Sequence, residues 1–152
     1  MENASARNMW GDYLDDHLEH AFVKAPEVVH FYDNKEDADQ CAQMIRAGSK
    51  KAVSRSLLGL QYRNEPLPQL GAFNVITNWE GEALCIIKTT AVRLKPFFSI
   101  DEQYTVLEGN ALSSLDSWKK YHWDYFTREL AVYGRVPRES TIVVCMEFEK
   151  VF

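Results

Sequence analysis

The middle of the chain has the residue pattern of a β-hairpin. Residues 72–77 and 83–94 favour strands, and the four residues between them, Asn78-Trp79-Glu80-Gly81, are typical of a short turn. Helical patterns precede the hairpin at 4–20 and 34–48 and follow it at 97–107 and 114–132, while single strand patterns lie at 27–33 and 141–148. This order predicts an α+β fold with a small mixed sheet or barrel, rather than a repeating βαβ fold.

Local signals mark where the helices begin and end. Asn34 is a candidate N-cap for the second helix, and Gly48 is a candidate stop signal for it. Ser49 directly after this glycine predicts the cap of another short helix that runs to about residue 58. The spacing Ser113-x-x-Asp116 is that of a capping box and predicts the start of the longest helix.

The length and composition limit the class of protein. A chain of 152 residues is expected to form a single domain over residues 1–152. It has no apolar run long enough to span a membrane, and the start of the chain lacks the pattern of a secretory signal. The three cysteines are isolated within apolar patterns, which favours buried thiols in a reducing cytosol over disulfides or a zinc site. We therefore expect a cytoplasmic protein without a bound metal or a membrane partner; the oligomeric state stays open.

Positive charge is concentrated in one window of an otherwise acidic chain. The formal net charge is -5, yet residues 40–64 contain no Asp or Glu and five basic residues: Arg46, Lys50, Lys51, Arg55 and Arg63. A local basic island on an acidic body favours a site for one phosphate, one carboxylate or a short strand. It argues against a protein that coats long duplexes. The alternative is that these side chains are simply solvated.

Gly48-Ser49-Lys50 is the sharpest feature inside this window. If a helix began at Ser49, its free backbone N–H groups would favour an anion. Lys50 would then oppose the helix dipole, which is easier to understand if it meets an anionic ligand than if it points into water. Both interpretations of Lys50 stay open on the residues alone.

Three further residues are candidates for function, each with a plain structural alternative. Glu108 follows the third predicted helix and matters only if the fold brings it to Lys50, where the two groups would tune each other's pKa. His122 lies on an apolar helix face, either as a core residue or as a ligand contact. Trp79 at the hairpin tip could stack on a base or a partner. Neither a phosphate-binding Gly-x-x-x-x-Gly-Lys loop nor Gly-x-Gly-x-x-Gly is present, so we expect no nucleotide cofactor.

Over nearly its whole length the chain resembles the ASCH domain family, in its longer bacterial branch. The segments that carry the resemblance are Ala47-Gly48-Ser49-Lys50, Glu65-Pro66-Leu67-Pro68, Leu84-Cys85-Ile86-Ile87, Glu108-Gly109, Trp118, His122 and Val143-Val144-Cys145. The resemblance implies a PUA-like fold, a small mixed β-barrel with packed helices, and a cleft lined by the Gly-x-Lys segment. Such domains are associated with RNA. One short branch hydrolyses N4-acetylcytidine with a lysine, a threonine and a glutamate, and one longer member is a ribonuclease.

The match to the family's functional residues is incomplete. The family lysine corresponds to Lys50 and its glutamate to Glu108, but the threonine position is occupied by Val53. Ser54 is adjacent, although on a helix it would point about 100° away. Loss of the hydroxyl weakens the amidohydrolase prediction, because a missing nucleophile commonly removes most of the rate.

We expect a protein that binds RNA, a nucleotide or a nucleoside in this cleft. The predicted contacts are Ser49, Lys51, Ser54, Arg55, Arg63 and His122, together with Lys50 and Glu108. The first alternative is a hydrolase, either ribonuclease or amidohydrolase, with Lys50 as general base or anion stabiliser and Glu108 as acid/base or orienting partner. The second is an interaction module that binds a small molecule or a protein.

Overall fold

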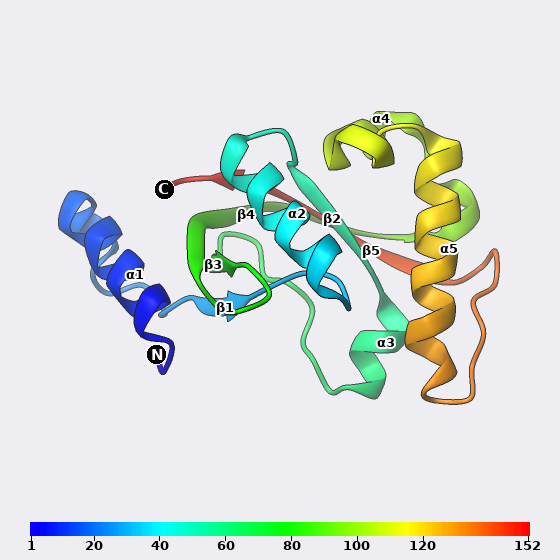
Figure 1. Cartoon of the computed structure of the whole chain (residues 1–152), viewed down its shortest axis with the longest axis horizontal. Helices are drawn as coiled ribbons and strands as arrows, with labels where there is room; N and C mark the ends of the chain where they lie inside the picture. Colours follow the sequence, from blue (N-terminus) through cyan, green and yellow to red (C-terminus); the bar gives the residue numbers. More distant parts are fainter.

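One five-stranded sheet runs through the middle of the molecule in the order β1-β3-β4-β5-β2 (Figure 1). The computed structural model describes all residues from 1 to 152. Only β1 and β3 pair in parallel, so the sheet is mixed, and β1 and β2 are its two edge strands. The strands are β1 (Glu27–Val29), β2 (Ala52–Ser56), β3 (Phe73–Thr77), β4 (Ala83–Pro96) and β5 (Ile142–Lys150). The predicted α+β class and the hairpin, formed by β3 and β4, are confirmed.

Helices pack around this sheet. They are α1 (Ala4–Asp16), α2 (Lys35–Ala47), α3 (Leu57–Tyr62), α4 (Glu102–Thr105) and α5 (Leu115–Ala131). In Figure 1, α1 lies at one end of the molecule and α5 at the other, with the sheet between them. The helix predicted over 97–107 is instead three short pieces: 3-10 turns at Phe97–Ser99 and Val106–Glu108, and α4 between them.

The predicted boundaries of α2 are confirmed. The Asn34 side chain accepts a hydrogen bond from the backbone N–H of Asp37, and Gly48 ends the helix with a left-handed φ of 82°. The longest helix lies close to its predicted range, but its N-cap is Ser114, which accepts from Ser117 N–H, and not Ser113. Adjacent serines offer the same capping chemistry, so the sequence signal was off by one residue.

The short helix predicted after Ser49 is wrong. Residues 52–56 form β2, which pairs antiparallel with β5 from Ala52↔Glu147 to Ser56↔Val143. The serine that caps a helix here is Ser56, whose hydroxyl accepts from Gly59 N–H at the start of α3. The predicted anion site at a helix N-terminus beside Lys50 therefore does not exist.

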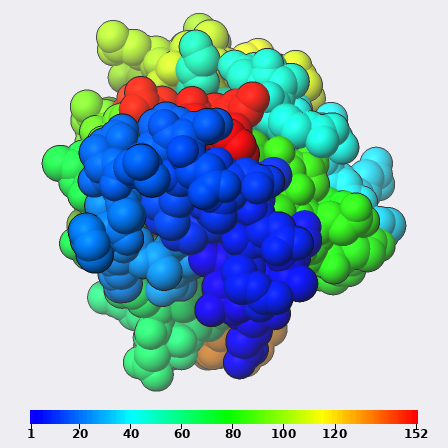
Figure 2. Space-filling model, turned by 90° about the vertical axis from the view of Figure 1, so that its left-hand side faces the viewer, coloured from blue at the N-terminus to red at the C-terminus, as the bar shows by residue number.

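The core residues form three clusters, each between the sheet and a different helix. Ile45 of α2 packs in one with Val53 and Ile87, Trp118 and Phe126 of α5 in another with Val143, and Trp10 and Tyr13 of α1 in the third with Val75. Figure 2 shows α1 over its end of the molecule, with the C-terminal residues beside it. The three cysteines are buried free thiols, as predicted. No helix is both long enough and apolar enough to cross a bilayer.

Candidate functional site

A carboxylate lies at the centre of a buried polar cluster between β2 and α5. The side chain of Glu108 has no exposed surface, and its Oε1 accepts a hydrogen bond from Lys50 Nζ at 2.8 Å. Its Oε2 accepts from the Ser54 hydroxyl at 2.6 Å and from the indole N–H of Trp118. A fourth donor, the hydroxyl of Tyr32, lies 3.4 Å from Oε1. Whether Glu108 reaches Lys50 was open on the sequence, and the fold brings the two side chains together.

Backbone packing fixes the positions of Lys50 and Glu108. Lys51 N–H donates to the carbonyl of Leu107 at 2.7 Å, so the two segments lie against each other. Gly109 has a φ of +74°, and a Cβ there would lie 2.3 Å from the Ser49 carbonyl oxygen. Only glycine permits this approach. The close contact holds the backbone after Glu108 against Ser49, next to Lys50.

Ser54 belongs to this cluster because residues 52–56 form a strand. Side chains alternate along a strand, so Ser54 faces α5 while its neighbours Val53 and Arg55 face the opposite side. The expectation that Ser54 would point away from the lysine is therefore wrong. The cluster contains a hydroxyl after all, one residue beyond the position of the family threonine. That hydroxyl is also 2.8 Å from the hydroxyl of Tyr104.

The cluster holds one ionised pair and one neutral histidine. Burial would raise the pKa of Glu108, but the Lys50 charge and the hydrogen bonds prevail and lower it to about 2. Burial lowers the pKa of His122, although Glu108 opposes this. The His122 Nδ1 lies 2.9 Å from the Trp118 carbonyl and donates to it. Nε2 is then an acceptor with no partner, 3.7 Å from Glu108 Oε2.

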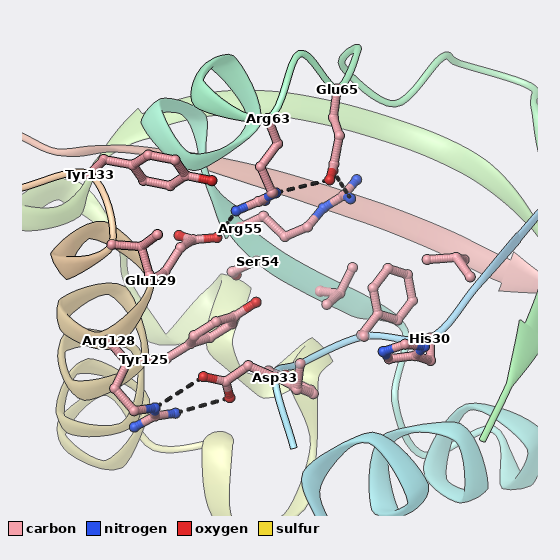
Figure 3. Close-up of a pocket in the computed structure, with 15 residues that line it drawn as sticks. His30, Asp33, Ser54, Arg55, Arg63, Glu65, Tyr125, Arg128, Glu129 and Tyr133 are labelled. Atoms are coloured by element: carbon pink, nitrogen blue, oxygen red, sulfur yellow. Dashed lines mark hydrogen bonds and ion pairs between the residues drawn. The ribbon is translucent and has the colours of Figure 1, made fainter. Parts of the chain in front are cut away.

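Next to the cluster lies a pocket of about 490 Å³, which we call the β1–β2 pocket because residues in and after both edge strands line it (Figure 3). Ser54 and Tyr32 line it as well, so it borders the buried cluster. Its aromatic walls come from Phe31, Tyr125 and Tyr133. The guanidinium of Arg55 packs over the ring of Phe31, with its carbon 5.9 Å from the ring centre.

Most charges in the β1–β2 pocket already have partners. It is lined by three arginines and three carboxylates. Arg63 contacts Glu65 at 2.9 Å and Glu129 at 2.8 Å, and Arg128 contacts Asp33 at 3.1 Å. These pairs neutralise two of the three arginines.

Arg55 is the exception. Its nearest carboxylate oxygen, on Glu65, is 3.9 Å away, beyond hydrogen-bond distance, and its buried Nε has no partner. The side chain remains 21% exposed. Arg55 is therefore the most weakly paired cation in this pocket, and the one best placed to accept an additional anion.

The structure sorts the predicted site residues into three groups. Lys50, Ser54, Glu108 and His122 form the buried cluster, and Arg55 and Arg63 line the pocket. Ser49 and Lys51 lie outside both, exposed at the turn between α2 and β2, where the Ser49 hydroxyl donates to the Met44 carbonyl. The basic window is thus divided among a buried ion pair, a pocket and an exposed turn.

Sequence reasoning missed several residues that shape the pocket. The strand predicted over 27–33 ends at Val29, and Tyr32, three residues later, has a left-handed φ of 74°. Its ring lies beside Lys50, with the ring centre 5.6 Å from Nζ. No sequence signal indicates this conformation. Glu129 follows Tyr125 by four residues and so shares its helix face, a spacing that could have revealed it. The structure contains no group of three or more His, Cys, Asp or Glu arranged to hold a metal ion.

Comparison with known proteins gives consistent relatives. A sequence model described as "ASCH domain" matches residues 27–152. The crystal structure of an ASCH domain from Lactobacillus crispatus JV V101 is 27% identical with a TM-score of 0.88, over 97% of this chain and 94% of that one. The crystal structure of protein EF3133 from Enterococcus faecalis V583 is 30% identical with a TM-score of 0.87, over 97% and 88% of the two chains. Comparison with curated proteins finds no significant match.

Proposed function

The chain belongs to the ASCH domain family and has the PUA-like fold, and from this premise we propose that it binds a nucleotide, free or within RNA, in the β1–β2 pocket. The observation that carries the proposal is Arg55. A partly exposed guanidinium without a hydrogen-bonded carboxylate, at the wall of a pocket, is a ready receptor for one phosphate.

The other walls suit the rest of a nucleotide. Phe31, Tyr125 and Tyr133 offer aromatic surface, and stacking on a base contributes about 1–3 kcal/mol. Arg63 and Arg128 also line the pocket, but their charges are neutralised by Glu129 and Asp33. The three arginines and three carboxylates of the lining balance in charge, so the pocket offers one phosphate a place at Arg55 next to a ring and is poorly suited to a highly charged duplex.

A matched pair of substitutions tests this function. Arg55→Met keeps the aliphatic stem and removes the charge, while Arg46→Met makes the same change at an exposed position of the basic window, outside the pocket. Anisotropy of a fluorescent single-stranded RNA, at low and moderate salt, measures the affinity. We expect at least a tenfold loss for Arg55→Met, because a charge-assisted hydrogen bond contributes about 1.5–3 kcal/mol, and little change for Arg46→Met.

Two results would count against binding in the pocket. Equal losses for the two variants would mean that RNA meets only diffuse positive charge. Absence of RNA binding at low salt, where phosphate contacts are strongest, would exclude RNA as the ligand.

A second candidate function is hydrolysis of a nucleic-acid substrate, and the position of Ser54 favours it. Ser54 lines the pocket, and its buried hydroxyl donates to Glu108, while Lys50 donates to the other oxygen of the same carboxylate. Ser54 would be the nucleophile, and Lys50 would stabilise developing negative charge. However, a carboxylate with its pKa at about 2 is a weak base at neutral pH. We therefore place binding first.

Hydrolysis is tested separately from binding. Single-stranded RNA and N4-acetylcytidine are incubated with the wild type and with Ser54→Ala, and products are separated on a denaturing gel or by chromatography. Turnover that Ser54→Ala abolishes would establish the hydrolase. Binding with intact RNA and intact nucleoside would leave a binding module.

A further inference from the structure

A second pocket of about 520 Å³ lies on the other side of Arg55. It is lined by residues 23–25, by β1 and by the loop that joins α3 to β3. Four residues line both pockets: Val29, Phe31, Arg55 and Glu65. The two hollows therefore share a wall, and Arg55 stands at their junction.

The second pocket differs in character from the first. Its surface comes mainly from apolar side chains of the proline-rich loop and the sheet: Val28, Pro66, Leu67, Pro68, Phe73 and Met146. Six polar side chains also line it: Lys24, Glu27, Arg55, Glu65, Gln69 and Asn74. The amide groups of Gln69 and Asn74 each donate a hydrogen bond to a backbone carbonyl. Apolar walls with a few amide groups suit a flat heterocycle.

We propose that the two pockets together hold two successive nucleotides of a single strand, with Arg55 on the phosphate that joins them. In a nucleotide strand each internal phosphate has a base on either side. The site has the matching order of pocket, guanidinium and pocket, so each pocket would take one base and Arg55 the phosphate between them. This inference rests on the proposed function and adds the class of ligand: a single-stranded dinucleotide step rather than a mononucleotide.

The size of the site favours the longer ligand. Each pocket alone lies within the range of about 300–1,000 Å³ that holds one small molecule. A mononucleotide in the β1–β2 pocket would leave the second pocket filled with water over exposed apolar side chains. A second base there would cover that surface. Single strands, whose bases can be splayed apart, can occupy two separate hollows, whereas a duplex cannot.

Two ligands with one phosphate each test the inference. AMP and the dinucleotide ApA both have a single phosphate, and AMP carries the larger negative charge, so charge alone favours AMP. The affinities of the full chain for AMP, ApA and ApApA are measured by calorimetry. We expect ApA to bind about tenfold more tightly than AMP, within the range for one stacked base, and ApApA to gain less than a further threefold.

Substitutions in the proline-rich loop locate the second base. Leu67, 37% exposed, lines the second pocket, while Leu70 in the same loop is 73% exposed and does not. Leu67→Ala should lower the affinity for ApA several-fold without changing that for AMP, and Leu70→Ala should change neither. Circular dichroism confirms that both variants fold.

The possible results distinguish failure of the two-nucleotide site from failure of nucleotide binding itself. Equal affinities for AMP and ApA, both lost in Arg55→Met, would overturn the two-nucleotide site and leave a mononucleotide site intact. An advantage for ApA that survives Leu67→Ala unchanged would also overturn it. Failure of all three ligands to bind would refute the proposed function itself.

Discussion

Replacing Glu108 with glutamine should destabilise the protein by an amount that depends on pH. The pKa of this carboxyl is about 2 in the fold, against an ordinary value of 4.5. The lowered pKa means that the folded state favours the ionised form, and the difference corresponds to roughly 3 kcal/mol of stability at neutral pH. Below about pH 4.5 the unfolded chain takes up a proton that the folded protein still resists, so this contribution fades.

The Glu108→Gln variant lacks the titrating group and shows no such change. The difference in unfolding free energy between wild type and variant should therefore be largest near pH 7. It should shrink by about 1–2 kcal/mol between pH 7 and pH 3.5, since only part of the contribution remains there. Urea unfolding, monitored by tryptophan fluorescence at several pH values, measures it.

His122 faces the same carboxylate and could titrate in this range. The comparison is therefore repeated in a His122→Gln background, so that imidazole protonation cannot contribute. A difference that stays constant with pH in both backgrounds would show that Glu108 is not held ionised by Lys50. A variant as stable as the wild type at pH 7 would refute the buried ion pair itself.

Two further substitutions test how the cluster is held in place. Ser54→Ala should cost about 1–3 kcal/mol in urea unfolding, because it removes a buried donor to the Glu108 carboxylate; a loss below about 0.5 kcal/mol would contradict that hydrogen bond. Gly109→Ala should be far more harmful than Gly134→Ala, since both glycines have positive φ but only at Gly109 would a Cβ meet backbone, the Ser49 carbonyl. Equal melting temperatures for the two alanine variants would show that this close approach is absent.

Local sequence signals predicted the elements whose ends are set by nearby residues. The boundaries of α2 follow from the Asn34 cap and the left-handed Gly48, both of which act within one turn of the helix. The hairpin of β3 and β4 is also local, because its strands are joined by a short turn. In these segments the propensity and the tertiary fold agree.

The segment after Ser49 failed because a distant partner decides its structure. Its pairing partner, β5, lies about ninety residues further along the chain, and no local pattern reports such contacts. Ser49 has cap chemistry, but the ladder with β5 outweighs one cap worth about 1 kcal/mol. The same error gave the wrong direction for the Ser54 side chain, because that direction was derived from helical rather than strand geometry.

The sequence identified some residues of the candidate site but not their partners. Resemblance to the family singled out Lys50 and Glu108, but only the fold shows that their side chains meet, at 2.8 Å. The charge pattern included Arg55 among five basic residues, without revealing that the other pocket arginines are paired. Those partners, such as Asp33 and Glu129, come from other elements and carry no signal near the basic window.

The difference between Lys50 and Arg55 determines which cation a ligand can meet. A phosphate that drew Lys50 away would leave Glu108 buried without its partner, at a cost of about 3–5 kcal/mol. That exceeds the roughly 1.5–3 kcal/mol that a charge-assisted hydrogen bond returns. Arg55 loses only a 3.9 Å contact with Glu65. In the proposed function, therefore, the family lysine stabilises the carboxylate beside the pocket, and the arginine five residues later binds the anion.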